Sequence, residues 1–340
     1  MTRADDRPSD EPTRRRILGE AGVGLAGLAG VGASTGAIGV GGTTSESNAT
    51  ARATQNVAVD EQPLLDAHTH LIPEATMDRE PLEAAELVVW MDDNGIDRAV
   101  VHALDSPEAY PVQAPSWWVL EQVEPYPDRL IPFCTVDPRT LVYEADFGAV
   151  TALFERYLEQ GMQGFGELKP GLPVDDSRLH WLYERCADDG LPILFHMDDK
   201  AMLDDVGLPR LEDVLASYPE VDFLAHAHAW WAHISADVGP DDRGAYPTGP
   251  VEPGGRVPEL LSTYDNVYGD LSAGSGWNAL TRDPAYAQGF LEDHHEQLLF
   301  GTDYLAPGQE VPQFELFERF DLSEDAWANI RYRNLEGVLE

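Results

Sequence analysis

The chain of 340 residues carries 61 acidic and 22 basic residues, a formal charge of -39, with an ordinary hydrophobic content of 43%. This charge argues against nucleic acid and anionic membrane surfaces as partners, because both are bound through clusters of basic side chains. Lysine occurs only at Lys169 and Lys200, and the acidic residues are spread along the whole chain. Such a surface stays hydrated in concentrated salt, so we expect an acidic, halophilic-type protein in a high-salt environment.

The first 40 residues predict an export signal. Residues 13–18 read TRRRIL, which resembles the twin-arginine motif, and residues 21–40 form an uncharged, Ala/Gly-rich run. A permanent transmembrane anchor is the alternative, but seven glycines in this run weaken helix propensity and apolar drive. We expect export by the twin-arginine route to the extracellular space or cell surface, without stable membrane insertion.

Residues 41–60 are polar and small and show no periodicity, which predicts a flexible linker. They contain the sequon Asn48-Ala49-Thr50, a weak signal for glycosylation. The only two cysteines, Cys134 and Cys186, have neither metal-binding nor redox spacing, so we interpret them as buried thiols.

From residue 61 onward, apolar runs of strand length alternate with segments of helical period. Eight such units predict a single-domain (β/α)8 TIM barrel over residues 61–340, with a doubly wound open sheet as the runner-up. The predicted strands are 64–68, 98–104, 130–136, 162–169, 191–196, 221–226, 267–271 and 298–302. The predicted helices are 80–94, 143–160, 177–189, 208–217 and 284–294.

Polar residues at the ends of the predicted strands favour the closed barrel, because side chains from every strand converge at its carboxyl face. These residues are Asp66, His68, His70, Glu167, Lys169, His196, Asp198, His226, His228, Asp270 and Asp303.

Four of these residues predict a metal site. His68 and His70 are two apart on one strand, so both imidazoles face the same way, and His196 ends a buried strand. A lone histidine such as His196 is as often a core group as a ligand. Together with the carboxylate of Asp303, the three histidines predict a Zn2+-type site with an open position for water.

Residues 230–258 are too long for a bare connector and predict an active-site loop, with a disordered insertion as the alternative. Trp230, Trp231 and His233 are candidates for lining a substrate pocket, although packing is the more common role of aromatic residues there.

The segments DAHTH, GELKP, FHMDD, AHAHAWW and FGTDY, taken together and in this order, resemble the amidohydrolase superfamily. The resemblance is closest to the amidohydrolase-related (amidohydrolase 2) branch, which also contains non-oxidative decarboxylases of the aminocarboxymuconate semialdehyde type. It implies His68, His70 and His196 as ligands and Asp303 as ligand and proton shuttle. It also implies that His226 binds a second metal or polarises the substrate.

The resemblance leaves the number of ions open. Members with two metals bridge them by a carboxylated lysine or a glutamate on the fourth strand, and this chain offers both Glu167 and Lys169 there. We favour one ion, with Lys169 or Glu167 contacting substrate. The alternative is that Glu167 and Lys169 only form an ion pair, either buried or solvated at the rim. Asp66 is expected either to hold an imidazole in one tautomer or to be a plain carboxylate at a strand end. Asp270 either contacts substrate or caps the following turn.

The expected function is metal-dependent hydrolysis of a small amide, lactone or ester. The metal would lower the pKa of its water toward about 7, Asp303 would shuttle the proton, and His226 or Lys169 would stabilise the oxyanion. A decarboxylase (lyase) of an aromatic or unsaturated acid is the second hypothesis, and a non-catalytic secreted binding protein is the third. The sequence is compatible with a homo-oligomer and does not determine the oligomeric state.

Overall fold

The structure is a computed structural model that describes residues 62–143 and 148–340. The expected export signal, the linker and the sequon lie outside these residues.

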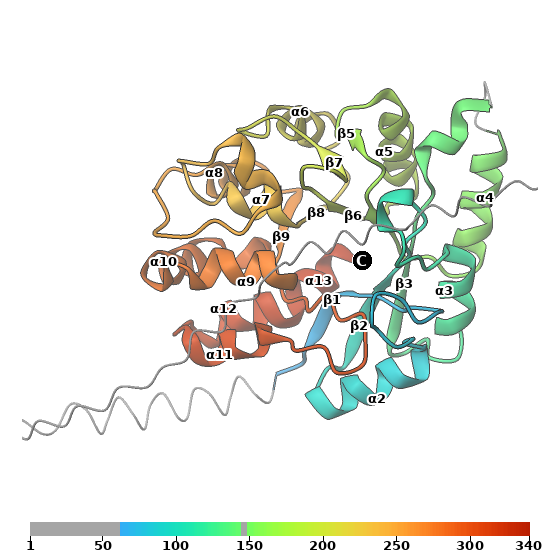
Figure 1. Cartoon of the computed structure of the whole chain (residues 1–340), viewed down its shortest axis with the longest axis horizontal. Coiled ribbons are helices and arrows are strands. Elements are labelled where there is room, and N and C mark those ends of the chain that lie inside the picture. The colour runs from blue at the N-terminus through green and yellow to red at the C-terminus, as the bar shows by residue number, and fades with distance from the viewer. Residues whose placement is uncertain (1–61, 144–147) are drawn as a thin grey trace, which may run out of the picture. The chain divides into compact units, whose positions relative to one another are not determined.

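Eight parallel strands form one sheet in the order β1-β2-β3-β4-β6-β8-β9-β10, and the sheet curls into a ring (Figure 1). Backbone hydrogen bonds from the amide of Ala67 to the carbonyl of Phe300 (2.9 Å) and from Asp303 to His68 (2.8 Å) bring the last strand beside the first. The predicted TIM barrel is therefore confirmed, and the open sheet is wrong. The strands are β1 Leu65–Thr69, β2 Arg98–His102, β3 Leu130–Cys134, β4 Gly164–Leu168, β6 Ile193–His196, β8 Phe223–His226, β9 Val267–Asp270 and β10 Leu298–Leu299.

Helices surround this ring (Figure 1). They are α2 Ala84–Asn94, α3 Ser116–Val123, α4 Gly148–Glu159, α5 Ser177–Asp189, α6 Pro209–Ser217, α7 His228–Ala232, α8 Arg256–Thr263, α9 Ala273–Thr281, α10 Pro284–His294, α11 Leu316–Arg319, α12 Glu324–Ala328 and α13 Asn334–Val338. Two short strands, β5 Leu172–Pro173 and β7 Met202–Leu203, pair with each other outside the ring.

The predicted bounds of α5 and α10 are confirmed. The prediction for α2 is four residues too long at its start, because Leu82 pairs with Ile72 through two backbone hydrogen bonds before the helix begins. The helix starts of α5 and α10 follow from their caps, since Asp176 and Asp283 each accept a backbone hydrogen bond from the first turn.

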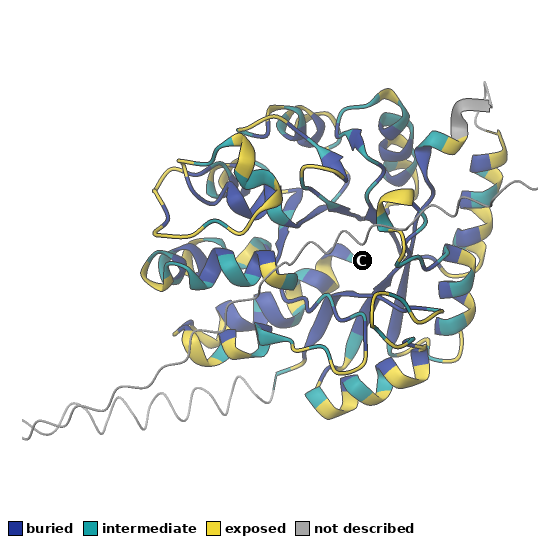
Figure 2. Ribbon diagram, in the orientation of Figure 1, coloured by how far each residue is buried: buried dark blue, intermediate teal, exposed yellow. Residues whose placement is uncertain are grey.

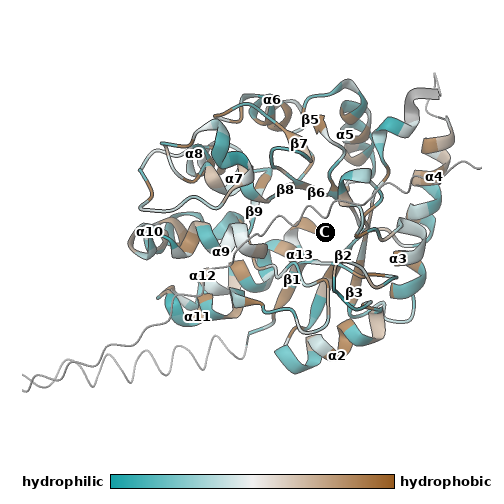
Figure 3. Ribbon diagram, viewed as in Figure 1, coloured by the Kyte–Doolittle hydropathy of each residue, from teal (hydrophilic) through white to brown (hydrophobic). Residues whose placement is uncertain are grey.

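The strands and parts of the surrounding helices are buried (Figure 2), and hydrophobic residues occur along both strands and helices (Figure 3). Leu335 and Val338 of α13 pack against the barrel's interior, where the chain ends near the centre of Figure 1. The amino end of the barrel is thus closed by apolar packing, which leaves the carboxyl end as the face for a site. The inward side chains are Leu65, Ala67, Val100, Ile131, Phe133, Leu194, Leu224 and Leu299.

Cys134 and Cys186 are free and buried, which confirms the prediction of buried thiols. Burial raises the pKa of both thiols, so neither is a ready nucleophile at neutral pH.

The segment 230–258 is less irregular than predicted. Helix α7 extends through Ala232, a short turn of 3-10 helix covers Pro240–Gly244, and α8 begins at Arg256. The segment is packed, with the amide of Ala236 bonded to the carbonyl of Glu252 (2.9 Å), so the alternative of a disordered insertion is wrong.

Within residues 62–143 and 148–340, no helix is both long enough and apolar enough to cross a bilayer. The segment 21–40, for which an anchor was the alternative, lies outside this range.

Candidate functional site

Polar side chains gather at the carboxyl end of the barrel, as the positions of the residues in the sequence predict. Almost every strand contributes one, and nearly all of them are buried. They are His68 from β1, His70 directly after it, His102 from β2, Glu167 from β4, His196 from β6, His226 from β8, Asp270 from β9, and Asp303 in the segment that follows β10.

His68, His70 and Asp303 form the central group of this site. The Nε2 atoms of the two histidines are 3.0 Å apart, and Asp303 Oδ1 lies 3.7 Å from the first and 3.4 Å from the second. Glu167 Oε2 lies 3.5 Å from His70 Nε2. Two ligands that each bind a tetrahedral ion at about 2.1 Å lie about 3.4 Å apart. The spacing of these four atoms therefore fits a divalent cation.

Hydrogen bonds on the far side of each ring fix the tautomers. His68 Nδ1 donates to Asp270 Oδ2 (2.7 Å), and His70 Nδ1 donates to the carbonyl of His102 (3.0 Å). In the neutral form of each ring, the Nδ1 proton is thus committed, and Nε2 presents a lone pair toward the same point. Metal-binding histidines are held in this way by an acceptor behind the ring, so the donor set is prepared for a cation.

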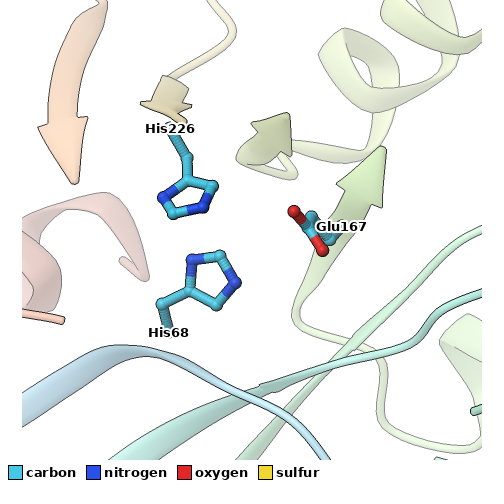
Figure 4. A group of neighbouring side chains, drawn as sticks. All are labelled: His68, Glu167 and His226. Atoms are coloured by element: carbon cyan, nitrogen blue, oxygen red, sulfur yellow. The ribbon is translucent and has the colours of Figure 1, made fainter. Parts of the chain in front are cut away.

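Asp270 connects His68 with His226. Its Oδ2 lies 2.7 Å from His68 Nδ1, 3.1 Å from His226 Nδ1 and 2.8 Å from the Ser272 hydroxyl that donates to it. The rings of His68 and His226 pack edge to face with centroids 4.4 Å apart, and Glu167 approaches both from β4 (Figure 4). One buried carboxylate therefore orients a histidine of the central group and the histidine of β8.

Glu167 forms a second set of charged contacts beside the central group. Lys169 Nζ lies 2.7 Å from its Oε2, and His196 Nδ1 lies 2.6 Å from its Oε1. Although burial would raise the pKa of Glu167, the charges of Lys169 and His196 hold it well below the usual range. Glu167 and Lys169 thus form a largely buried ion pair beside the central group.

His196 is not in the central group. It reaches that group through Glu167, while its other ring nitrogen, Nε2, lies 3.3 Å from Asp198 Oδ2. The predicted four-ligand set is therefore only partly brought together: His68, His70 and Asp303 converge, and Glu167 stands next to them where His196 was expected.

The charges of the central residues follow from their surroundings. Burial alone would lower the pKa of His68, but the charge of Asp270 and its hydrogen bond raise it to about 9. Burial would raise the pKa of Asp303, whereas its bond with His70 and the charge of His68 lower it to about 2. Burial and the neighbouring His68 lower the pKa of His226, so this ring is neutral.

Two cavities lead from the central group to the surface. An inner one of about 160 Å³ is lined by His70, Glu167, Lys169, His196 and Asp303, among others, and an outer one of about 460 Å³ is lined by Tyr246 and the loop after β10. Both include Arg79, Asp303 and Leu305, so they adjoin at these residues.

The remaining predicted residues lie elsewhere. Trp230 and Trp231 are buried, and the Trp231 indole donates to the backbone carbonyl of Asp270 (2.8 Å). His233 is held between the Ala229 carbonyl and the Gly207 amide. None of the three is among the residues that line the two cavities, and their contacts are those of packing.

Asp270 takes one of its two expected roles, and Asp66 does not hold an imidazole. Asp270 is fully buried behind His68, and it accepts the backbone hydrogen bond of Ser272 at the following turn (3.0 Å), the capping alternative. Asp66 holds no imidazole: it accepts from the backbone amides of His68 and Thr302 and from the Thr302 hydroxyl, and so ties β1 to the segment after β10.

Four residues at or near the site were missed from the sequence. His102 and Ser272 had a signal, because each follows the same pattern of a polar residue at or just after a strand end. Arg79 and Tyr246 lie on loops, and no local pattern distinguishes them.

A family model described as amidohydrolase matches residues 65–334. No sequence among the curated proteins matches the chain. An uncharacterized TIM-barrel protein from Bordetella bronchiseptica superposes with a TM-score of 0.57 at 18% identity, over 82% of this chain and 98% of the other. A putative 2-pyrone-4,6-dicarboxylic acid hydrolase from Pseudomonas putida gives 0.53 at 16%, over 82% and 98%. A 5-carboxyvanillate decarboxylase from Novosphingobium aromaticivorans, complexed with manganese and a nitrobenzoic acid, gives 0.51 at 16%, over 82% and 96%.

At these identities the solved structures show a shared fold. The family match reaches from β1 to the first residue of α13 and so includes every strand end that builds the site. The chain belongs to the amidohydrolase family, in its amidohydrolase 2 branch, whose barrel carries a cluster suited to a divalent metal.

Proposed function

We propose that the protein is a metal-dependent hydrolase of a small carbonyl compound, an amide, lactone or ester, that also carries a carboxylate. The observation that carries this proposal is the central group: two histidines with fixed tautomers and one carboxylate converge where a cavity opens. Buried polar atoms without such a purpose are costly to a fold.

A divalent cation held by His68, His70 and Asp303, with Glu167 beside them, would lower the pKa of a bound water and polarise a carbonyl oxygen. Zn2+ or Mn2+ suits this mixture of imidazole and carboxylate ligands. The manganese in the decarboxylase structure supports a divalent metal without selecting between the two.

Asp303 is placed to move the proton. Its side chain is 24% exposed, which makes it the member of the central group most open to the cavity, and its ionised form accepts a proton. We infer that Asp303 takes the proton of the attacking water and returns it to the leaving group. Its backbone is held in the left-handed region (φ 55°) by the bond from its amide to the His68 carbonyl, which fixes the direction of the side chain.

Cationic groups on the path support an anionic substrate. Arg79 lines both cavities, and Lys169 lines the inner one. The outer cavity is also lined by the acidic Asp78 and Glu80, so the support for a carboxylate substrate comes from Arg79, which lines both cavities, and from Lys169 further in. The two relatives named above as hydrolase and decarboxylase, by their printed names, both act on carboxylic acids.

Non-oxidative decarboxylation is the second candidate. The same cations would bind the carboxylate, and the neutral His226 and Asp303 would handle the proton that replaces CO2. The chain superposes on the 5-carboxyvanillate decarboxylase (TM-score 0.51) about as well as on the 2-pyrone-4,6-dicarboxylic acid hydrolase (0.53), which supports decarboxylation as the second candidate.

A substrate panel of lactones, amides, esters and aromatic acids, each with and without a carboxylate, separates these candidates. With the protein loaded with Zn2+ or Mn2+, hydrolysis incorporates one oxygen of ¹⁸O-water into the product and releases no CO2. Release of CO2 without ¹⁸O incorporation would favour the lyase. Turnover of no compound, with a stoichiometrically bound metal, would favour a binding protein.

A further inference from the structure

We propose a distal subsite beside the outer cavity, in which Arg282 binds a carboxylate carried on a planar ring of the substrate. The subsite is a cavity of about 420 Å³, and it adjoins the outer cavity because Tyr246 and Gly274 line both. The inference rests on the proposed function, since it extends the substrate of the same site. The lining residues are Tyr246, Gly274, Trp277, Asn278, Thr281 and Arg282.

Helix α9 forms one wall of the distal subsite, and it lies beside α7 (Figure 1). Gly274, Trp277, Asn278 and Thr281 are three or four residues apart, so they lie along one face of this helix. The inner cavity, the outer cavity and the distal subsite share lining residues and make a continuous run outward from the central group. The inner cavity of about 160 Å³ holds only a small group, so a longer substrate has room to continue toward α9.

The charge of the distal subsite differs from that of the two cavities before it. The inner cavity contains the carboxylates of Glu167 and Asp303, and the outer one contains those of Asp78 and Glu80. No acidic residue lines the distal subsite, although the chain has 61 of them, and its one charged lining residue is Arg282. The local charge therefore favours an anionic group in this cavity.

Arg282 directly follows α9, and no protein group in the described part of the chain satisfies its guanidinium. Its Nε and Nη2 are buried without a hydrogen-bond partner, which is unusual for buried polar atoms. Burial lowers the pKa of Arg282, and the charges of Asp237, Asp242 and Asp283 offset this only in part. Each of these three carboxylates accepts a hydrogen bond from another group of the protein. Arg282 is thus an available cation.

Two aromatic side chains suit a planar ring in the distal subsite. Tyr246 is 51% exposed, and its ring packs against His228 with centroids 4.6 Å apart. Trp277 is held by Arg319, whose guanidinium carbon lies 4.8 Å from the centroid of the indole ring. Aromatic walls that are held in place give a large contact area to a planar ring and favour stacking on it. The ring and its carboxylate would therefore both find a partner.

Three matched probes test the distal subsite by isothermal titration calorimetry, with the full chain both free of metal and loaded with Mn2+. N-acetylglycine carries an amide and a carboxylate, hippurate adds a ring, and N-(4-carboxybenzoyl)glycine adds a carboxylate on that ring. We expect the ring carboxylate to tighten binding about 10–100-fold over hippurate, as a hydrogen-bonded charge pair does.

Three variants assign this gain in affinity. Arg282→Gln should abolish the gain from the ring carboxylate, and Tyr246→Ala should weaken the binding of both ring-bearing probes but not of N-acetylglycine. Arg156→Gln, which removes an exposed arginine of α4, should behave like the wild type. Circular dichroism checks that each variant is folded.

The proposal is overturned if no probe binds, if the ring carboxylate brings no gain, or if Arg282→Gln keeps the gain. An equal loss in Arg156→Gln would also overturn it, because a general charge effect would then explain the result. Failure of the proposed function has a different signature: the Mn2+-loaded protein turns over no carbonyl compound, while the gain that depends on Arg282 remains. Turnover of small compounds without that gain would remove the distal subsite alone.

Discussion

His68 and Asp270, 202 residues apart in the chain, are joined by a hydrogen bond of 2.7 Å between Nδ1 and Oδ2, and both side chains are fully buried. In the neutral ring, this bond keeps the proton on Nδ1 and the lone pair on Nε2, toward the central group. If the central group holds a cation as proposed, Asp270 orients one of its ligands without touching a substrate.

Asp270→Asn should weaken metal binding by about 10–100-fold, because an amide orients the ring without the charge that raises its basicity. Titration of the stripped protein with Zn2+ measures the change. Asp265→Asn, an exposed position just before β9, is the matched control and should bind like the wild type. Equal affinity in the two variants would contradict the role of Asp270.

His70→Gln removes one donor of the central group. We expect the central ion to be lost and turnover to fall by more than about 100-fold, since removing a residue that only orients a ligand already costs 10–100-fold. Metal analysis and steady-state kinetics measure both effects. Retained turnover with a lost ion would show that the reaction does not use this group.

Gly301→Ala should disturb Asp270. A Cβ at this position would lie 2.4 Å from Asp270 Oδ1 and 3.0 Å from Ser272 Cβ, so the carboxylate must move. We expect a loss of about 1–3 kcal/mol in the free energy of unfolding, as for other overpacked cores, together with weaker metal binding.

The control for this substitution is Gly289→Ala in α10, where a Cβ meets nothing within 4 Å. A helix interior prefers alanine, so this variant should be more stable by about 0.5–1 kcal/mol. Urea denaturation measures both. A neutral Gly301→Ala would mean that the packing around Asp270 is looser than its contacts indicate.

Arg79→Gln tests the binding of an anionic substrate. A hydrogen bond to a charged group contributes about 1.5–3 kcal/mol, which corresponds to a KM increase of about 10–100-fold, with a smaller change in kcat. Lys200→Gln removes a positive charge that is 79% exposed and lines neither cavity. It should leave KM unchanged, and an equal increase in both variants would point to a general charge effect.

Asp176 makes stability depend on pH. Its carboxylate caps α5 and pairs with Arg178 (2.8 Å), and the hydrogen bond from Arg178 lowers its pKa. The ionised form is the stabilising one, so the contribution is complete above the unfolded pKa of about 3.9 and is lost as the pH falls through the lower folded value.

Asp176→Ala should therefore lower the free energy of unfolding by about 1 kcal/mol at pH 7, and by less near pH 3. Urea denaturation at the two pH values measures the difference. Asp188→Ala, at an exposed position of the same helix, controls for the substitution itself. A loss that is the same at both pH values would show that the cap acts without its charge.

Much of the barrel and part of the site could be predicted from the sequence, because both depend on local periodicity. Apolar runs of strand length alternate with amphipathic segments, and in a parallel barrel all strand ends share one face. The spacing of His68 and His70 places both rings on one side of β1, and Asp303 follows the last strand. These three residues do converge.

The tertiary structure alone decided which atoms meet. The acceptor behind His68 comes from β9, far along the chain, and the partner of Asp66 is a backbone amide instead of an imidazole. His196 turns one nitrogen to Glu167 and the other to Asp198. These outcomes depend on side-chain rotamers and on the register between distant strands, about which the pattern of a single segment contains no information.

The roles of loop residues also could not be predicted from the sequence. Trp230 and Trp231 were candidates for lining a pocket, with packing as the more common role, and they pack into the core, while Arg79 and Tyr246, without any local signal, line the cavities. The chain alone determined a barrel and the strand ends where its chemistry gathers, since these follow from periods of 2 and 3.6 residues. Only the closed fold decided which rings, carboxylates and loop residues share one space, because that depends on packing between segments up to 236 residues apart.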